Sequence, residues 1–421
     1  MTDVRMTALD ILLQYDGSKM FLSDLVRASL DKYSYLEERD RAYIKSVVTG
    51  CVEKRIALDY IIDRVSKVRT AKMKKVVKLI IRMASYEIFF MDHIPARASV
   101  NEAVRLVKKK HISQLSGFVN AVTRQVSALF EEGGDIWPDT KTRYSCPDII
   151  YSLLTDTYGT ETADSIIKAS DEVGPGYIRI NTLKTNTDSL MKKLKAEGVE
   201  AEKTPLSENA LKVSGLIPGQ SRAFKDGLFT VQDLSGIASL DAAGIKEGMT
   251  VIDLCAAPGG KACTAAEYMH QTGRVLAFDI SEAKTEKINE NIARLGLENI
   301  ETKVKDALLF DETLKETADL VIADLPCTGL GVMGRKVDIK YRIQKEDIEN
   351  LAMLQRQILD NAVRYVKPGG KLLFSTCTIT KEETVSQRDY IRNKPGFNLV
   401  SERQFLQGID PCDGFYYAVF M

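Results

Sequence analysis

The chain has 421 residues, of which 44% are hydrophobic and 28% charged, and its formal net charge is zero. This length is enough for two or three domains with their own cores, and the composition is that of a globular protein. No apolar run reaches the roughly 18–20 residues of a membrane helix, and the N-terminal residues lack a signal-peptide pattern. We therefore expect a cytoplasmic protein.

The neutral total hides an uneven distribution of charge. Residues 1–130 contain 23 Lys and Arg against 14 Asp and Glu, whereas the remainder contains 35 against 44. A basic first third favours contact with a polyanion. A solvated helical surface is an equally good explanation, because the imbalance over 130 residues is moderate.

The seven cysteines and three histidines of the chain form neither a C-x-x-C pair nor a pattern of metal ligands. An odd number of cysteines without such motifs argues against a disulfide framework and against a zinc site. We expect free thiols, some of them chemically active, and no metal.

The first 135 residues are predicted to form an all-helical domain. Apolar residues recur every three or four positions over 36–65 without an internal proline, which predicts an amphipathic helix. Ser99 and Glu102 have the spacing of a capping box, which predicts that a helix over 98–110 begins there, after Pro95. A further helix is predicted over 117–130.

Two more domains are predicted beyond a linker at 131–148. Residues 141–230 contain a strand, a helix and a strand at 177–185, 187–198 and 210–215, which indicates a small α+β domain. From 231 to 421 strands alternate with helices, which indicates an α/β Rossmann-like fold with a mostly parallel sheet between helices. Its strands are predicted at 249–254, 274–279, 300–304, 320–324 and 371–376, with an apolar strand at the chain's end.

A small-residue loop joins the first of these strands to a helix in "TVIDLCAAPGGKACTAAEYM". Gly259 and Gly260 allow a ligand to approach the backbone, and the helix start offers free N–H groups. The loop fits neither G-x-x-x-x-G-K-[ST] nor G-x-G-x-x-G, which weighs against nucleoside triphosphates and against a dehydrogenase. It predicts a site for a phosphate or for the amino-acid end of a cofactor.

Two carboxylates, Asp279 and Asp306, stand where the next two strands end. All such ends meet at one edge of a doubly wound sheet, where ligands bind. Asp279 is suited to ribose hydroxyls and Asp306 to an adenine amino group. Each alone is explained as well by a helix cap or a turn, but together with the loop they favour an adenosine cofactor.

Two cysteines, Cys327 and Cys377, also follow strand ends, in "DLVIADLPCTGLG" and "GGKLLFSTCTIT". A thiolate can add to C6 of cytosine, after which C5 accepts a methyl group from a sulfonium donor. That chemistry needs a nucleophile, a base and an acid, which two thiols and Asp324 can supply. The residues alone do not rank the two cysteines, and each alone could be a small buried hydrophobe.

The motifs "DLCAAPGGKA", "DLPCTGLG" and "STCTITKEE" resemble those of the NOL/NOP2/Sun family of RNA cytosine-5 methyltransferases, Sun/Fmu group. "ASVNEAVRLVKK" and "GFVNAVTRQV" resemble the NusB-type domain that begins the 16S ribosomal RNA members. The resemblance implies a class I methyltransferase domain with an antiparallel last strand, and S-adenosyl-L-methionine as cofactor. It also implies a 16S ribosomal RNA partner, no membrane or metal, and a monomer.

The resemblance also implies roles for single residues. Cys377 is the nucleophile, and Cys327 helps to release the methylated product. Asp324 holds the cytosine edge, and Lys261 supports Asp324 or the cofactor. The expected cofactor contacts are Cys255, Ala256, Ala257, Pro258, Gly259, Gly260, Lys261, Asp279, Asp306 and Asp324.

The sequence departs from the family pattern at residues 334–338, "GRKVD", at Leu234 and at Cys412. The first departure bears on how the RNA strand is gripped, and none removes a catalytic group. Two alternatives stay open: the same chemistry on another RNA such as transfer RNA, and an RNA-binding scaffold without activity.

Overall fold

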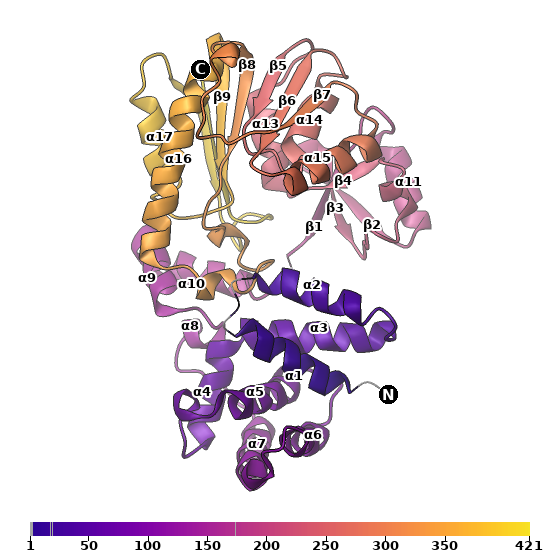
Figure 1. Cartoon of the computed structure of the whole chain (residues 1–421), viewed down its shortest axis with the longest axis vertical. Coiled ribbons are helices and arrows are strands. Elements are labelled where there is room, and N and C mark those ends of the chain that lie inside the picture. Colours follow the sequence, from indigo (N-terminus) through magenta and orange to yellow (C-terminus); the bar gives the residue numbers. More distant parts are fainter. Residues whose placement is uncertain (1–2, 17, 19, 173) are drawn as a thin grey trace. The chain divides into compact units, whose positions relative to one another are not determined.

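The computed structural model describes residues 3–16, 18, 20–172 and 174–421. The chain divides into two compact units (Figure 1): Met1–Thr155 with Arg335–Arg342, and Asp156–Gly334 with Ile343–Met421. Within the described ranges, no helix combines the length and apolarity needed to cross a membrane.

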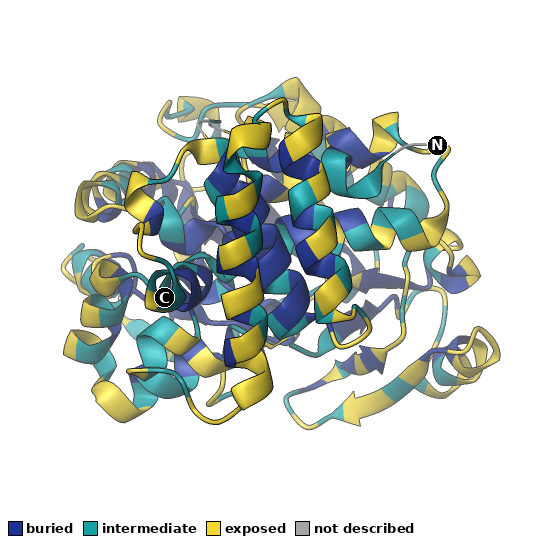
Figure 2. Ribbon diagram, turned by 90° about the horizontal axis from the view of Figure 1, so that it is seen from below, coloured by how far each residue is buried: buried dark blue, intermediate teal, exposed yellow. Residues whose placement is uncertain are grey.

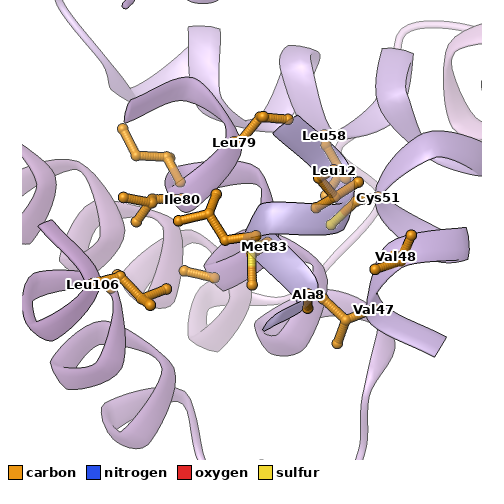
Figure 3. Packing of buried hydrophobic residues seen from close by; sticks show 14 of the residues in the cluster. Ala8, Leu12, Val47, Val48, Cys51, Leu58, Leu79, Ile80, Met83 and Leu106 are labelled. Carbon is orange, nitrogen blue, oxygen red and sulfur yellow. The ribbon is translucent and has the colours of Figure 1, made fainter. Parts of the chain in front are cut away.

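The first unit is helical, and α5 (Lys75–Phe90) is its central helix. Helix α5 packs against five other helices, and ten of its sixteen residues are therefore buried. Side chains from α1, α3, α4, α5 and α6 meet in its core (Figure 3). The remaining α-helices are α1 (Val4–Tyr15), α2 (Leu22–Lys32), α3 (Glu38–Glu53), α4 (Arg55–Val65), α6 (Ala96–Lys109), α7 (Ser116–Glu132), α8 (Thr140–Arg143) and α9 (Asp148–Tyr158), which crosses the unit boundary.

Two helix boundaries in this unit differ from the prediction. The single helix predicted over 36–65 is two helices, α3 and α4, which break at Lys54. Helix α6 begins at Ala96 after Pro95, so the capping box predicted at Ser99 is wrong. Ser99 is 1% exposed inside the helix, because proline is compatible with a helix start and Ser99 falls on the buried face.

Residues 335–342 come from the loop that follows Cys327 in the sequence, yet they pack with the helical unit. Asp338 is 2% exposed and accepts hydrogen bonds from the backbone N–H of Leu22 at 3.0 Å and from Arg342 Nε at 2.8 Å. The Tyr341 hydroxyl donates to the Glu53 carbonyl at 2.7 Å. Of the residues at which the sequence departs from the family pattern, 335–338 thus belong to the helical unit, and Val337 lies in its core.

The second unit begins with α10 (Thr160–Ala169) and a small antiparallel sheet in the order β2-β3-β1-β4. Arg179 of β1 is fully buried and pairs with Glu267 of the larger domain in this unit. This part is therefore packed firmly onto the larger domain rather than tethered to it. Its other elements are β1 (Gly176–Ile180), α11 (Thr187–Ala196), β2 (Glu200–Thr204), β3 (Ser207–Ser214), α12 (Arg222–Lys225) and β4 (Phe229–Val231).

A seven-stranded sheet in the order β10-β11-β9-β8-β5-β6-β7 forms the rest of the unit. Its strands run parallel except β11, which is antiparallel to β9 and β10. The fold class predicted from the sequence is confirmed, including the antiparallel last strand. The strands are β5 (Thr250–Asp253), β6 (Arg274–Asp279), β7 (Ile300–Val304), β8 (Ala318–Asp324), β9 (Val366–Thr376), β10 (Leu399–Phe405), which the sequence analysis missed, and β11 (Phe415–Phe420).

Helices cover both faces of this sheet (Figure 1). Alternate strand residues face the two layers: Val251 and Ile322 belong to the core beneath α13, α14 and α15, whereas Ile252 and Val321 belong to the core beneath α16 and α17. In the helical unit, buried and exposed residues likewise alternate along the helices in the foreground of Figure 2. The helices are α13 (Leu234–Ala243), α14 (Gly260–Tyr268), α15 (Glu282–Leu295), α16 (Lys345–Tyr365) and α17 (Val385–Arg392).

The order of the strands fixes where a ligand can bind. The chain runs outward from β5 to β6 and β7, and then returns to β8 on the other side of β5. The switch point therefore lies between β5 and β8, and ligands of doubly wound sheets bind at the carboxyl ends of the strands there. The domain boundaries at 1–135, 141–230 and 231–421 stay predictions.

Candidate active site

A cavity of about 250 Å³ lies at this switch point. The loop after β5 forms one wall, and Asp324 and Cys377, at the ends of β8 and β9, contribute to another. Gln232 and Asp233 before α13, and residues 413–415 at the start of β11, complete the lining.

The loop between β5 and α14 is held by the neighbouring strand and helix. The backbone N–H of Ala257 donates to Asp279 Oδ2 at 3.0 Å, and Asn291 Nδ2 donates to the Pro258 carbonyl at 2.9 Å. Gly259 has φ of 104°, and a Cβ there would lie 3.3 Å from the Ile288 backbone. Glycine is therefore required by both the turn and the close approach of α15.

Asp253, the last residue of β5, lines the cavity and was missed by the sequence analysis. Its side chain is 1% exposed, and neither carboxylate oxygen has a hydrogen-bond partner among the described residues. Burial, and then the nearby Asp324, raise the pKa of Asp253 to about 7. The rule applied to Asp279 and Asp306, a carboxylate at a strand end, would also have found Asp253.

Asp279 and Asp306 follow β6 and β7 as predicted, but their carboxylates are used locally. Asp279 is 4% exposed, binds the loop N–H of Ala257 and forms an ion pair with Lys284 at 2.9 Å. Asp306 accepts from the backbone N–H of Leu308 at 2.9 Å, as in a turn. Neither is among the described residues that line the cavity, so their contact with a cofactor stays a prediction.

Lys261 contacts Asp324 at the cavity. Lys261 Nζ lies 2.6 Å from Asp324 Oδ2, and the Ser375 hydroxyl donates to Asp324 Oδ1 at 2.7 Å. One third of the Asp324 side chain remains exposed. Asp324 is thus held in a fixed orientation with part of its carboxyl group open to a ligand.

Cys327 and Cys377 lie side by side, because β8 and β9 are adjacent parallel strands in which Asp324 pairs with Ser375. Their sulfur atoms are 3.3 Å apart. The hydrogen bond with Cys377, followed by burial, raises the pKa of Cys327 well above that of a free thiol. Cys377 is among the residues that line the cavity, whereas Cys327 is not.

Other groups around the cavity were not singled out from the sequence. Gln232 accepts hydrogen bonds from Arg179 Nε at 2.9 Å and from the Thr264 hydroxyl at 3.2 Å, so the small sheet fixes one wall. Phe415 lies beneath Lys261, whose Nζ is 5.1 Å from the ring centroid. In the described part of the chain, no three His, Cys, Asp or Glu side chains form a group suited to a metal ion.

A relative from Bacillus subtilis (strain 168), named probable ribosomal RNA small subunit methyltransferase B, is 32% identical over 419 residues. The match covers 97% of this chain and 93% of the relative. The chain belongs to the ribosomal RNA small subunit methyltransferase B family. The family membership that the sequence motifs predicted is thereby confirmed.

Three family models match successive parts of the chain. They are the NusB family over residues 2–128, the RsmF/B-like ferredoxin-like domain over 146–218, and 16S rRNA methyltransferase RsmB/F over 242–409. The helical NusB-type start predicted from the sequence is confirmed, and the small α+β region is matched by the ferredoxin-like model.

Solved structures agree with the methyltransferase fold. The structure of PH0851 has a TM-score of 0.80 and 24% identity, and the match covers 99% of this chain and 98% of that one. A methyltransferase homologue from Pyrococcus horikoshii has a TM-score of 0.61 and 25% identity, covering 68% of this chain and 99% of the other. The first likeness shows the fold alone.

Proposed function

We propose that this protein transfers a methyl group from S-adenosyl-L-methionine to C5 of a cytosine in 16S ribosomal RNA. The observation that carries the proposal is the pair of sulfur atoms, Cys327 and Cys377, 3.3 Å apart at the edge of the cavity. The names of the relatives, which specify the small ribosomal subunit RNA, support the choice of substrate.

The charge of the cavity suits the cofactor. Four carboxylates, Asp233, Asp253, Asp324 and Asp413, line it together with a single cation, Lys261. Asp253 has no partner among the described side chains and backbone groups, so it is available to a positively charged group. When bound, S-adenosyl-L-methionine supplies an electrophilic methyl group on a sulfonium centre. The loop residues 255–261 and Asp253 would hold it.

The chain's own residues account for the steps at cytosine. The Cys377 sulfur bonds to C6, the C5–C6 double bond breaks, and its electron pair becomes available at C5. Asp324, anchored by Lys261 and Ser375, holds the cytosine edge. When C5 bonds to the methyl group, the bond between that methyl group and the sulfonium centre would break. Water then takes up the C5 proton, the double bond is restored and the C6–sulfur bond breaks.

Two observations support Cys377 as the nucleophile. Its side chain lines the cavity, whereas that of Cys327 does not. The raised pKa of Cys327 keeps this residue a thiol at neutral pH, in hydrogen-bond contact with the Cys377 sulfur. As the C6–sulfur bond breaks, the Cys327 thiol can then donate its proton to the departing Cys377 sulfur.

A basic cavity in the helical unit supports RNA as the substrate. It measures about 520 Å³ and is lined by five cationic side chains, two of them from the segment 335–342, and by two carboxylates, Asp31 and Asp338. Arg41 Nε is buried there without a hydrogen-bond partner in the described residues. Such a cavity suits backbone phosphates, which supply most of the sequence-independent affinity for RNA. The cations are Arg27, Arg41, Lys45, Arg335 and Lys336.

The test is methylation of 16S ribosomal RNA by the purified protein, followed by mapping of 5-methylcytosine. We expect 5-methylcytosine at one position of the 16S RNA. The same cytosine should be unmodified in RNA from cells lacking the gene. Modification of transfer RNA alone would favour the alternative substrate. Binding of S-adenosyl-L-methionine without methylation of any RNA would favour the scaffold.

A further inference from the structure

Glu383 is a carboxylate enclosed in the protein directly behind the two cysteines. It lies between β9 and α17, six residues after Cys377, and its exposure is 0%. A buried carboxylate is costly unless donors surround it, and this one has five. Its oxygens accept from the Thr328 N–H at 2.9 Å and from the hydroxyls of Thr328, Thr378 and Thr380 and the amide of Gln355 at 2.6, 3.2, 2.8 and 3.2 Å.

These donors belong to both cysteine segments. Thr328 directly follows Cys327, and Thr378 directly follows Cys377. Their hydroxyl oxygens are 2.7 Å apart and share the same carboxylate oxygen. Gln355 of α16 adds a further link, because its amide also donates to the Pro326 carbonyl at 2.9 Å. One side chain thus ties the two turns together.

We propose that Glu383 is a positioning residue that sets the separation of the Cys327 and Cys377 sulfur atoms. The inference rests on the proposed function for its catalytic meaning, but not for its geometry. Its five hydrogen bonds form together only when both turns are docked, so moving either turn leaves buried polar groups without partners. Glu383 is not among the residues lining the cavity in the described chain, so it acts through the cysteines.

Electrostatics point in the same direction. The negative charge of Glu383 adds to the hydrogen bond with Cys377 and to burial in raising the pKa of Cys327. Glu383 thus contributes to the raised pKa of Cys327 while it holds the turn in place.

Oxidative cross-linking of the full-length protein measures the spacing directly. Diamide converts the two thiols into a disulfide and takes up the two electrons and two protons, and mass spectrometry of an unreduced digest identifies the Cys327–Cys377 peptide. We expect Glu383→Ala to slow this reaction at least tenfold. Glu383→Gln, which keeps an oxygen for the Thr328 N–H and can donate to the threonine hydroxyls, should largely restore the rate.

Glu382→Ala is the matched control, because Glu382 is the exposed neighbour of Glu383. It should cross-link as fast as the unmodified protein. Should Glu383→Ala fail to fold, Thr328→Val carries the test, since it removes the hydroxyl that donates to the carboxylate. A wild-type cross-linking rate in the folded Glu383→Ala, or in Thr328→Val where the first does not fold, would overturn the proposal.

Kinetics separate this inference from the proposed function. With 16S RNA as substrate, Glu383→Ala should lower kcat by about 100-fold, the effect of misplacing a reacting group by about 1 Å, and leave the cofactor Kd unchanged. Slower cross-linking in a protein that methylates no RNA would uphold the positioning role and reject the proposed function. Normal kcat and normal cross-linking in Glu383→Ala, with an active parent enzyme, would reject the positioning role and uphold the proposed function.

Discussion

Asp253 and Glu383 are both buried carboxylates of the catalytic unit, and their surroundings are opposite. Glu383 accepts five hydrogen bonds, whereas Asp253 accepts none from the described residues and has a pKa raised to about 7. Hydrogen-bond donors offset the free-energy cost of burying a charged carboxylate. Without such donors, this cost is not offset. Glu383 therefore stabilises the site, whereas Asp253 is available to a ligand.

Removing Glu383 should have the larger effect on stability. Glu383→Ala leaves several buried donors unsatisfied, and we expect the free energy of unfolding to fall by about 3 kcal/mol. Urea denaturation measures the change, with Glu382→Ala as the control that should stay within about 0.5 kcal/mol of the parent. Equal stability of Glu383→Ala and Glu382→Ala would mean that the Glu383 carboxylate does not stabilise the fold. The distinction between Glu383 and Asp253 would then be lost.

Changing Asp253 should affect the ligand rather than the fold. Asp253→Asn abolishes the charge that would meet a cationic cofactor, and we expect the affinity for S-adenosyl-L-methionine at pH 7.5 to fall by about tenfold or more. Calorimetric titration measures the Kd. An unchanged Kd would mean that Asp253 does not contact the cofactor.

The pH dependence of stability sharpens the same contrast. Because the folded pKa of Asp253, about 7, exceeds its ordinary value of 3.8, the folded state binds its proton more tightly than the unfolded state. The free energy of unfolding should therefore decrease as pH rises from about 5 to about 8, by about 2 kcal/mol from this group. Urea titrations of the ligand-free protein should show this slope, and Asp253→Asn should lack it. The same slope in both proteins would assign it to other groups.

The affinity for the cofactor should increase as pH rises, whereas the stability of the ligand-free protein should decrease. Ionised Asp253 favours a cation, so binding of S-adenosyl-L-methionine should strengthen between pH 6 and 7.5 by severalfold. Asp253→Asn should show a flat profile over the same range. A parallel rise in both proteins would contradict a role for this carboxylate.

The helical unit also contains, among its described residues, a paired and an unpaired buried group, and we expect a smaller effect there, on RNA binding. Arg82 is paired with Asp59 at 2.6 and 2.7 Å, whereas Arg41 Nε has no partner in the described chain. Arg41→Gln should reduce the slope of log K for RNA against log salt concentration by about one. Arg39→Gln, at an exposed site of the same helix outside the cavity, should reduce it less. Equal reductions would indicate a diffuse charge effect.

The sequence predicted much of the site because strand ends are readable from local patterns. Apolar runs followed by Asp324, Cys327 and Cys377 predicted that these residues meet at one sheet edge, and the cysteine sulfurs are indeed in contact. The strand rule also applied to Asp253, which was overlooked. Helix boundaries within 36–65 and at Ser99 were wrong, because tertiary packing overrides local spacing.

The remaining features depend on contacts between distant residues. Glu383 ends an ordinary "TKEE" run, and only the fold reveals its donors on three segments. Arg179 appears in the sequence as one cation within a strand, although it is buried against Glu267. Residues 335–342 give no local sign that they pack with the helical unit.

The central claim, that Cys377 attacks cytosine and Cys327 assists release, is tested most directly by trapping the covalent intermediate. Full-length Cys327→Ala is incubated with 16S RNA and S-adenosyl-L-methionine and analysed on a denaturing gel. We predict a stable protein–RNA adduct for this variant and none for Cys377→Ala. An adduct with Cys377→Ala but not with Cys327→Ala would exchange the two roles, and no adduct with either would contradict covalent catalysis by this pair.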